Sequence, residues 1–206
     1  MSTDTQPTAS WFDEAFTERD VMVILRGRSP GATASLCHRA WDLGIAQVEV
    51  PVQSPDAMPS LLAAIAAGAE RGRQVGAGTV TSVEQLEMVA NAGVSFTVAP
   101  GLDEDVIRWS TDHGLPHLPG VSTPSEIQRA LRLGSPWLKV FPASVLGPEW
   151  FRAVRAPFPH LRMVATGGVT TDTARRYHDA GARVISLGSA LEDERQLEAL
   201  PELLRR

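Results

Sequence analysis

The sequence predicts an α/β protein of one domain, a (β/α)8 or TIM barrel that follows a short N-terminal helix. Short apolar runs of strand length alternate with helical segments about eight times along the chain. Most of the helical segments stop at a glycine, and regular alternation of this kind indicates parallel strands. The chain has 206 residues, which is enough for one core and close to the lower size limit of this barrel.

The first half of the chain carries clear boundary signals. Residues 1–9 are polar and are expected to be flexible, residues 10–206 form the predicted barrel domain, and 11–17 reads as a short helix. Apolar runs predict strands at 21–25, 47–52, 74–80 and 95–99. Helices are expected at 31–43, 55–67, 82–92 and 103–113, with Pro55 and Ser82 as starting signals and Gly44, Gly68, Gly93 and Gly114 as stops.

The second half repeats the same alternation. Strands are expected at 116–119, 137–141, 162–165 and 183–187, and helices at 123–133, 148–156, 171–180 and 192–204. A doubly wound open sheet is the alternative architecture. It would usually carry a glycine-rich nucleotide-binding fingerprint after its first strand, and Arg26-Gly27-Arg28 is not one. The barrel is therefore preferred.

Composition limits the partners and the chemistry. A net charge of −5 without a basic stripe argues against nucleic-acid binding, although local cations and backbone amides could bind a small anion. The single cysteine, Cys37, excludes an internal disulfide and is expected to pack in the core. No signal-peptide pattern and no bilayer-length apolar run are present, so we expect a cytoplasmic protein without a membrane partner. The five histidines lack metal-ligand spacing, so no metal is expected.

Lys139 is the only lysine of the chain, and the other 18 of the 19 Lys and Arg residues are arginine. Its neighbours in Trp137-Leu138-Lys139-Val140-Phe141-Pro142 are apolar. A guanidinium stays protonated at ordinary pH, whereas a desolvated amine can be neutral and attack a carbonyl. The pattern indicates either a nucleophilic amine or a surface lysine at a strand end, where most lysines lie.

Strand alternation predicts that Glu49 and Lys139 both face the barrel interior. Val48, Val50 and Val52 form one face of the second strand, and Leu138 and Val140 lie on one face of the sixth; these aliphatic faces suit the helix layer. The two polar residues lie on even-numbered strands, which supply the same interior layers. Their meeting would make either a buried structural ion pair or a Schiff-base lysine with a carboxylate that shuttles protons.

Active sites of this fold lie at the carboxyl ends of the strands. The residues at these ends are Arg26-Gly27, Gln53-Ser54, Gly78-Thr79, Pro100-Gly101, Pro119-Gly120, Phe141-Pro142, Thr166-Gly167-Gly168 and Gly188-Ser189. Glycines after the last two strands let backbone N–H groups approach a ligand, and loops at this place often bind phosphate. The alternative is that these glycines only form tight turns.

These motifs together resemble the class I aldolases that cleave 2-keto-3-deoxy-6-phosphogluconate (KDPG) and related 2-keto acids. The resemblance runs from about Val21 to about Leu191 and rests on the following ordered pieces. They are Ile24-Leu25-Arg26, Val48-Glu49-Val50, Gly76-Ala77-Gly78-Thr79-Val80, Pro100-Gly101, Pro119-Gly120-Val121, Leu138-Lys139-Val140-Phe141-Pro142, Thr166-Gly167-Gly168-Val169 and Gly188-Ser189-Ala190. It implies a homotrimer, a covalent substrate adduct on lysine and no metal or other cofactor.

The resemblance also implies roles for single residues. Lys139 would form the Schiff base, and Glu49 would move protons through a water. The pyruvyl portion would contact Thr79, and Pro100 and Phe141 would shape the pocket, while apolar Trp137 and Phe141 would favour a neutral amine. Further substrate contacts are expected from Arg26, Gln53 and Thr166, and phosphate contacts from Gly167, Gly168, Gly188 and Ser189.

One position departs from the family pattern. Many members carry an arginine four residues after the glutamate to hold the substrate carboxylate, and this chain has Gln53 there. Arg26 could take over part of that anchoring. The predicted reaction is cleavage of KDPG to pyruvate and glyceraldehyde 3-phosphate. Alternatives are the 6-phosphogalactonate epimer, 4-hydroxy-2-oxoglutarate, a phosphate-binding barrel transferase or isomerase, and a non-catalytic sugar-phosphate-binding barrel.

Overall fold

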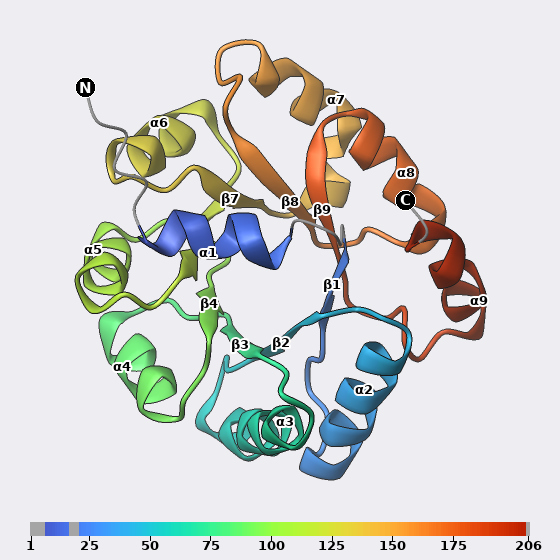
Figure 1. Cartoon of the computed structure of the whole chain (residues 1–206). Coiled ribbons are helices and arrows are strands. Elements are labelled where there is room, and N and C mark those ends of the chain that lie inside the picture. The colour runs from blue at the N-terminus through green and yellow to red at the C-terminus, as the bar shows by residue number, and fades with distance from the viewer. Residues whose placement is uncertain (1–6, 17–20, 205–206) are drawn as a thin grey trace.

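Parallel strands form a ring that is surrounded by helices, as the sequence predicts (Figure 1). The structure is a computed structural model and describes residues 7–16 and 21–204. Its strands are β1 (Val21–Ile24), β2 (Gln47–Pro51), β3 (Val75–Gly78), β4 (Phe96–Val98), β5 (His117–Leu118), β6 (Gly120–Val121), β7 (Trp137–Val140), β8 (Arg162–Thr166) and β9 (Ala182–Leu187). Pairing follows the order β5-β4-β3-β2-β1-β9-β8-β7-β6, and each neighbouring pair is parallel.

The fifth expected strand, 116–119, is replaced by two short strands on either side of Pro119. β5 pairs with β4, and β6 pairs with β7. Proline has no N–H to donate to a ladder, so the strand changes partner at this residue. The Gly120 N–H donates to the Gly101 carbonyl and the Lys139 N–H donates to the Pro119 carbonyl, both at 2.9 Å. The ring is therefore closed through the backbone of a bent fifth strand.

The helices cover the outside of the ring (Figure 1). The first described helix is α1 (Pro7–Ala15). Residues 7–9 of the segment predicted to be flexible are therefore helical, and residues 1–6 lie outside the described residues. The outer helices are α2 (Pro30–Asp42), the 3-10 turn η1 (Pro55–Ala57), α3 (Met58–Arg71), α4 (Val83–Asn91), α5 (Glu104–His113), α6 (Pro124–Arg132), α7 (Ala143–Arg155), α8 (Thr171–Asp179) and α9 (Glu194–Leu203).

At two glycines, a helix boundary differs from the sequence prediction. α3 continues past Gly68 and ends at Gly72, which has φ 60°. Gly68 is buried inside the helix, where a Cβ would come within 2.6 Å of the Arg73 carbonyl oxygen, so close packing explains this glycine. α7 includes an extra turn before Gly147, whose φ of 75° and ψ of 163° interrupt the helix in front of Pro148.

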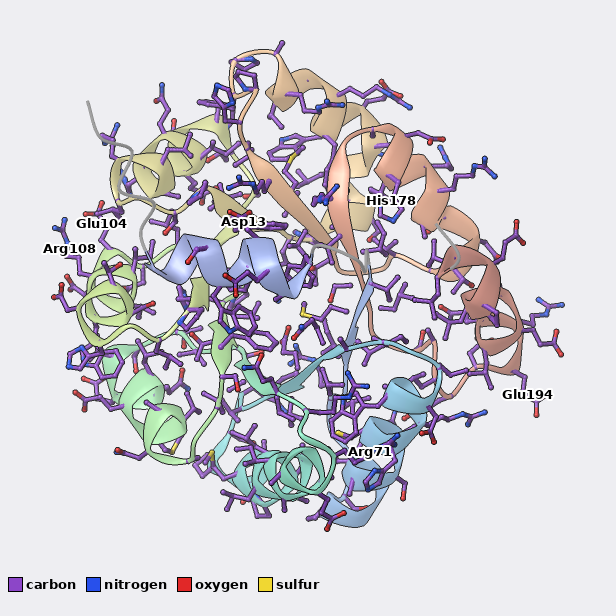
Figure 2. The ribbon with its side chains drawn as sticks, in the orientation of Figure 1. Asp13, Arg71, Glu104, Arg108, His178 and Glu194 are labelled. Atoms are coloured by element: carbon purple, nitrogen blue, oxygen red, sulfur yellow. The ribbon has the colours of Figure 1, made fainter. Side chains whose placement is uncertain are left out.

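The core has two parts. The valines of β2 and the aliphatic residues of β7 pack outward against the helices, as the alternation predicted. A second cluster, which combines aromatic and aliphatic side chains, fills the amino end of the barrel beneath α1 and contains Phe12, Phe16, Met22, Phe96, Val98, Leu118, Trp137, Val164 and Val184. Asp13 fixes α1 to the barrel, because its carboxylate accepts a hydrogen bond from Trp137 Nε1 at 2.9 Å and pairs with Arg162 Nε at 3.1 Å (Figures 1 and 2). The carboxyl end is thus the end left for a ligand.

Candidate active site

A cavity of about 180 Å³ opens among the carboxyl ends of β1, β7, β8 and β9. Its lining residues are Ile24, Arg26, Lys139, Phe141, Thr166, Gly167, Gly168, Ser186 and Gly188. Seven of these nine were predicted as site residues from the sequence. Strands that lie far apart in the chain are brought together here because β1 pairs with β9 and β9 pairs with β8. The carboxyl end is where the ligand sites of this fold form.

Lys139 is buried in this cavity, with 2% of its surface exposed, which rules out the alternative of a surface lysine. Its Nζ lies 5.4 Å from the centre of the Phe141 ring. Trp137 does not line this cavity. Its indole packs against Phe12 and Phe16 at the amino end of the barrel, and its expected contribution to the surroundings of the amine stays a prediction.

Glu49 faces the barrel interior and is completely buried, as predicted. Its carboxylate lies against Gly78, where a Cβ would come within 1.6 Å of Oε1. Neither carboxylate oxygen has a hydrogen-bond partner within the described part of the chain, so Glu49 and Lys139 are not joined as a direct ion pair. Burial raises the pKa of Glu49, and the nearby charges of Lys139 and Arg26 act in the opposite direction. A raised pKa means that the carboxyl group holds a proton more readily, which suits a group that both donates and accepts protons.

Arg26 connects the ends of three strands. Its Nη1 donates to Gln53 Oε1 at 3.2 Å, and its Nη2 donates to Thr79 Oγ1 at 3.3 Å. Thr79 has φ 61°, and a β-branched residue in this left-handed region is an outlier that occurs where surrounding structure imposes it. The three side chains, each expected to contact substrate, therefore form one cluster, in which a guanidinium supplies the positive charge that Gln53 lacks.

The glycines after β8 and β9 border the same cavity. Gly167 and Gly168 have φ values of 95° and 71°, which favour glycine, and a Cβ at Gly168 would come within 2.3 Å of Ser144 Oγ. A Cβ at Gly188 would meet no atom within 4 Å, so the backbone there borders open space. Ser189 lies beside the cavity, and its hydroxyl accepts a hydrogen bond of 2.8 Å from Gln196 Nε2. Because this bond uses an acceptor position, the Ser189 O–H can donate to a ligand.

The remaining predicted site residue, Pro100, lies outside the cavity lining. A Cβ on Gly120 would come within 2.3 Å of the Pro100 carbonyl carbon, so Pro100 packs against β6 next to the strand that carries Lys139. Sequence reasoning missed Ile24 and Ser186, which also line the cavity. Alternation within β9 could have found Ser186, because it lies two residues before Gly188 and shares its face.

Other reactive groups are placed elsewhere. Cys37 is buried in α2, and burial raises the pKa of its thiol to about 12, which fits the predicted packing role. Among residues 7–16 and 21–204, no group of three or more histidine, cysteine or acidic side chains could hold a metal ion. In the same part of the chain, no helix is long and apolar enough to cross a membrane.

Comparison with known proteins decides between the families that share this fold. The family model described as KDPG and KHG aldolase, where KHG is 4-hydroxy-2-oxoglutarate, matches residues 12–201. This chain belongs to that family. The resemblance predicted from the ordered motifs is thereby confirmed.

Several named aldolases match this chain over most of its length. A Rhizobium meliloti protein named probable 2-dehydro-3-deoxy-6-phosphogalactonate aldolase is 38% identical over 175 residues, which are 84% of this chain and 82% of that protein. The Escherichia coli 2-dehydro-3-deoxy-6-phosphogalactonate aldolase is 34% identical over 176 residues, 85% of each chain. A crystal structure described as a 4-hydroxy-2-oxoglutarate and 2-dehydro-3-deoxyphosphogluconate aldolase from TTHB1 superimposes with a TM-score of 0.81, at 30% identity, covering 97% of this chain and 95% of the other.

Proposed function

We propose that this protein is a class I aldolase that cleaves a six-carbon 2-keto-3-deoxy-6-phospho sugar acid into pyruvate and glyceraldehyde 3-phosphate. The observation that carries the proposal is the placement of the only lysine of the chain. Lys139 is buried, lines the cavity at the carboxyl end of the barrel and lies near a fully buried carboxyl group. A buried amine beside a proton-transfer group is the arrangement that Schiff-base chemistry needs.

The reaction would begin when the neutral Lys139 amine attacks the keto carbon C2 and forms a carbinolamine. Loss of water gives a protonated imine. Removal of the proton from the C4 hydroxyl then lets the C3–C4 bond break, with its electron pair moving toward the imine to form an enamine and release the aldehyde. Protonation of C3 and hydrolysis of the imine release pyruvate and restore the amine. Glu49 would exchange the protons through a water.

Two groups of residues at the site suit the two charged ends of such a substrate. Arg26 would bind the carboxylate next to the keto carbon, with Gln53 and Thr79 holding its guanidinium in place. The glycine loops after β8 and β9 would bind the phosphate through backbone N–H groups, with the Ser189 hydroxyl beside them. Phe141 lies near the amine and Pro100 supports the neighbouring strand, and Thr166 contributes a hydroxyl to the cavity.

The sequence prediction put the phosphogluconate epimer of the substrate first, and the order of the two epimers is reversed in this proposal. Two relatives that cover most of this chain carry the galactonate name, so we place the phosphogalactonate substrate first and KDPG second. The Arg26–Gln53–Thr79 cluster gives both epimers the same carboxylate anchor, because they differ only at C4. We retain the homotrimer as part of the proposal, to be checked by light scattering after size-exclusion chromatography.

Borohydride trapping tests the central step. The protein is incubated with pyruvate and sodium borohydride, and peptide mass spectrometry is expected to find a reduced pyruvyl adduct on Lys139. Absence of an adduct on the folded protein would refute the class I mechanism and would favour the phosphate-binding transferase, isomerase or non-catalytic barrel. Lys139→Arg, which keeps a long basic side chain that cannot become a neutral nucleophile, is expected to retain the fold and lose both the adduct and turnover. Rates with the two purified epimers then decide the substrate.

A further inference from the structure

Ser186 on β9 is a buried hydroxyl for which the fold gives no use. It is 2% exposed and lines the cavity, and its Oγ has no hydrogen-bond partner in the described part of the chain. Thr166, its register partner on β8, shows the same three features. An unpartnered buried hydroxyl destabilises a fold, and alanine would fill the position without that cost. The hydroxyl pair is therefore better explained by a ligand than by packing.

The strand register places this pair between the level of Lys139 and the glycine loops. Lys139 is paired with Val164, and Val164 is paired with Val184, whereas Thr166 is paired with Ser186. Ser186 thus lies one inward-facing position beyond the level of the Lys139 backbone. Gly188, at the next inward-facing position of the same strand, borders open space at the glycine loop. A substrate that runs from the amine to this loop passes the Ser186 hydroxyl on its way.

We propose that Ser186 hydrogen-bonds the C5 hydroxyl of the substrate, which is the hydroxyl on the carbon next to the phosphorylated carbon. The inference rests on the proposed aldolase function and adds a specificity-determining residue to it. β8, which carries Thr166, pairs directly with the Lys139 strand β7, whereas β9 lies one strand further from β7. Ser186 is therefore positioned for the hydroxyl farther from the keto carbon, and Thr166 for the C4 hydroxyl. The C5 configuration is shared by both epimers, since both release the same glyceraldehyde 3-phosphate. Selection at Ser186 is therefore independent of the epimer.

The aldol-addition direction isolates this contact. Pyruvate is combined either with glyceraldehyde 3-phosphate or with 3-oxopropyl phosphate, which has the same aldehyde and phosphate but lacks the hydroxyl in question. For Ser186→Ala, kcat/KM with glyceraldehyde 3-phosphate is expected to fall about 10-fold, while kcat/KM with 3-oxopropyl phosphate changes little. The preference for the hydroxylated aldehyde should shrink by the same factor. An unchanged preference, or an equal fall with both aldehydes, would overturn the assignment.

A matched control and a stability measurement separate this role from a structural one. Ser110 in α5 is also 2% exposed, but its hydroxyl donates to the Leu115 carbonyl, so Ser110→Ala should leave the aldehyde preference unchanged. Ser186→Ala should not lower the melting temperature, because it removes an unpartnered hydroxyl; a clear loss of stability would point to a structural role instead.

Borohydride trapping of pyruvate distinguishes the two levels of the proposal. If the unmodified protein forms no adduct on Lys139, the aldolase function fails and the Ser186 assignment fails with it. If both the unmodified protein and Ser186→Ala trap pyruvate but share one aldehyde preference, only the Ser186 assignment is wrong.

Discussion

A substitution at Gly78 can displace the Glu49 carboxylate while Glu49 itself stays unchanged. In Gly78→Ala, the new Cβ would lie 1.6 Å from Glu49 Oε1, 2.4 Å from Cδ and 2.8 Å from Cγ. Contacts shorter than about 3.0 Å are excluded by overlap, so Oε1 has to move by at least about 1.4 Å. A displacement of about 1 Å in a catalytic group can reduce a rate about 100-fold, which corresponds to about 2.7 kcal/mol of activation free energy.

The expected result for Gly78→Ala is a fall in kcat of about 100-fold, measured by coupling pyruvate release to lactate dehydrogenase. Overpacking should also reduce the free energy of unfolding by about 1–3 kcal/mol, and urea denaturation will show whether the fold is retained. Gly31→Ala is the matched control, because a Cβ at Gly31 would meet no atom within 4 Å and kcat should not change.

A double-mutant cycle shows whether the loss acts through Glu49. Glu49→Gln alone is expected to lower kcat strongly, and adding Gly78→Ala to it should lower kcat little further, because the displaced group is no longer a carboxylate. Two losses that add fully on the logarithmic scale would refute the reasoning, and so would a Gly78→Ala enzyme with unchanged kcat.

Three further predictions follow from the same site. Arg26→Lys should raise KM for the 2-keto acid about 10-fold, with a smaller effect on kcat, because an ammonium cannot contact Gln53, Thr79 and a carboxylate in the same planar geometry. Initial rates measure both constants, and an unchanged KM would exclude Arg26 as the carboxylate anchor. Thr79→Asn should raise the free energy of unfolding by about 1 kcal/mol in urea titrations, because asparagine tolerates φ near 61° better than a β-branched residue, and a destabilised variant would contradict this. Glu49→Gln should stabilise the protein at neutral pH but not below pH 4.5. Burial raises the pKa of Glu49 above its value of 4.5 in the unfolded chain, so the native state of the unmodified protein binds more protons than the unfolded state. The stability of the unmodified protein therefore falls as the pH rises from 4.5 through the folded pKa. Melting temperatures of both proteins between pH 4 and 8 check the sign, and parallel curves would contradict it.

Local signals in the sequence were sufficient for the order of elements but not for every boundary. Gly114 ends α5 as predicted, because it adopts a left-handed φ of 66° at the end of the helix. Gly68 is also a glycine, yet it lies inside α3, where the Arg73 carbonyl oxygen approaches too closely for a side chain to fit. The sequence of 116–119 likewise does not reveal that Pro119 divides a strand between two partners. Such distinctions depend on contacts between segments that are distant in the chain.

Contacts between distant segments also limited how much of the candidate active site could be predicted from the sequence. The inward positions of Glu49 and Lys139 followed from alternation within single strands, which is a local property. The Arg26–Gln53–Thr79 cluster depends on the spacing of three strand ends, so the sequence indicated each residue but not the hydrogen bonds among them. Ser186 was missed because serine in an apolar strand looks unremarkable until its hydroxyl is seen to face the cavity without a partner.

The barrel separates stabilising and functional features between its two ends. At the amino end, α1 closes the barrel with packed aromatic rings, and Asp13 satisfies both Trp137 and Arg162. Toward the carboxyl end lie the buried oxygens of Glu49, Thr166 and Ser186 without hydrogen-bond partners in the described residues, and Thr79 in a left-handed conformation. Each of these features lowers stability, and Thr166 and Ser186 also line the cavity, so a role toward a ligand explains these two hydroxyls better than folding does. They persist at this end because the packing of α1 and the outer helices offsets their cost, which leaves polar groups preorganised for a substrate that brings its own hydrogen-bonding groups.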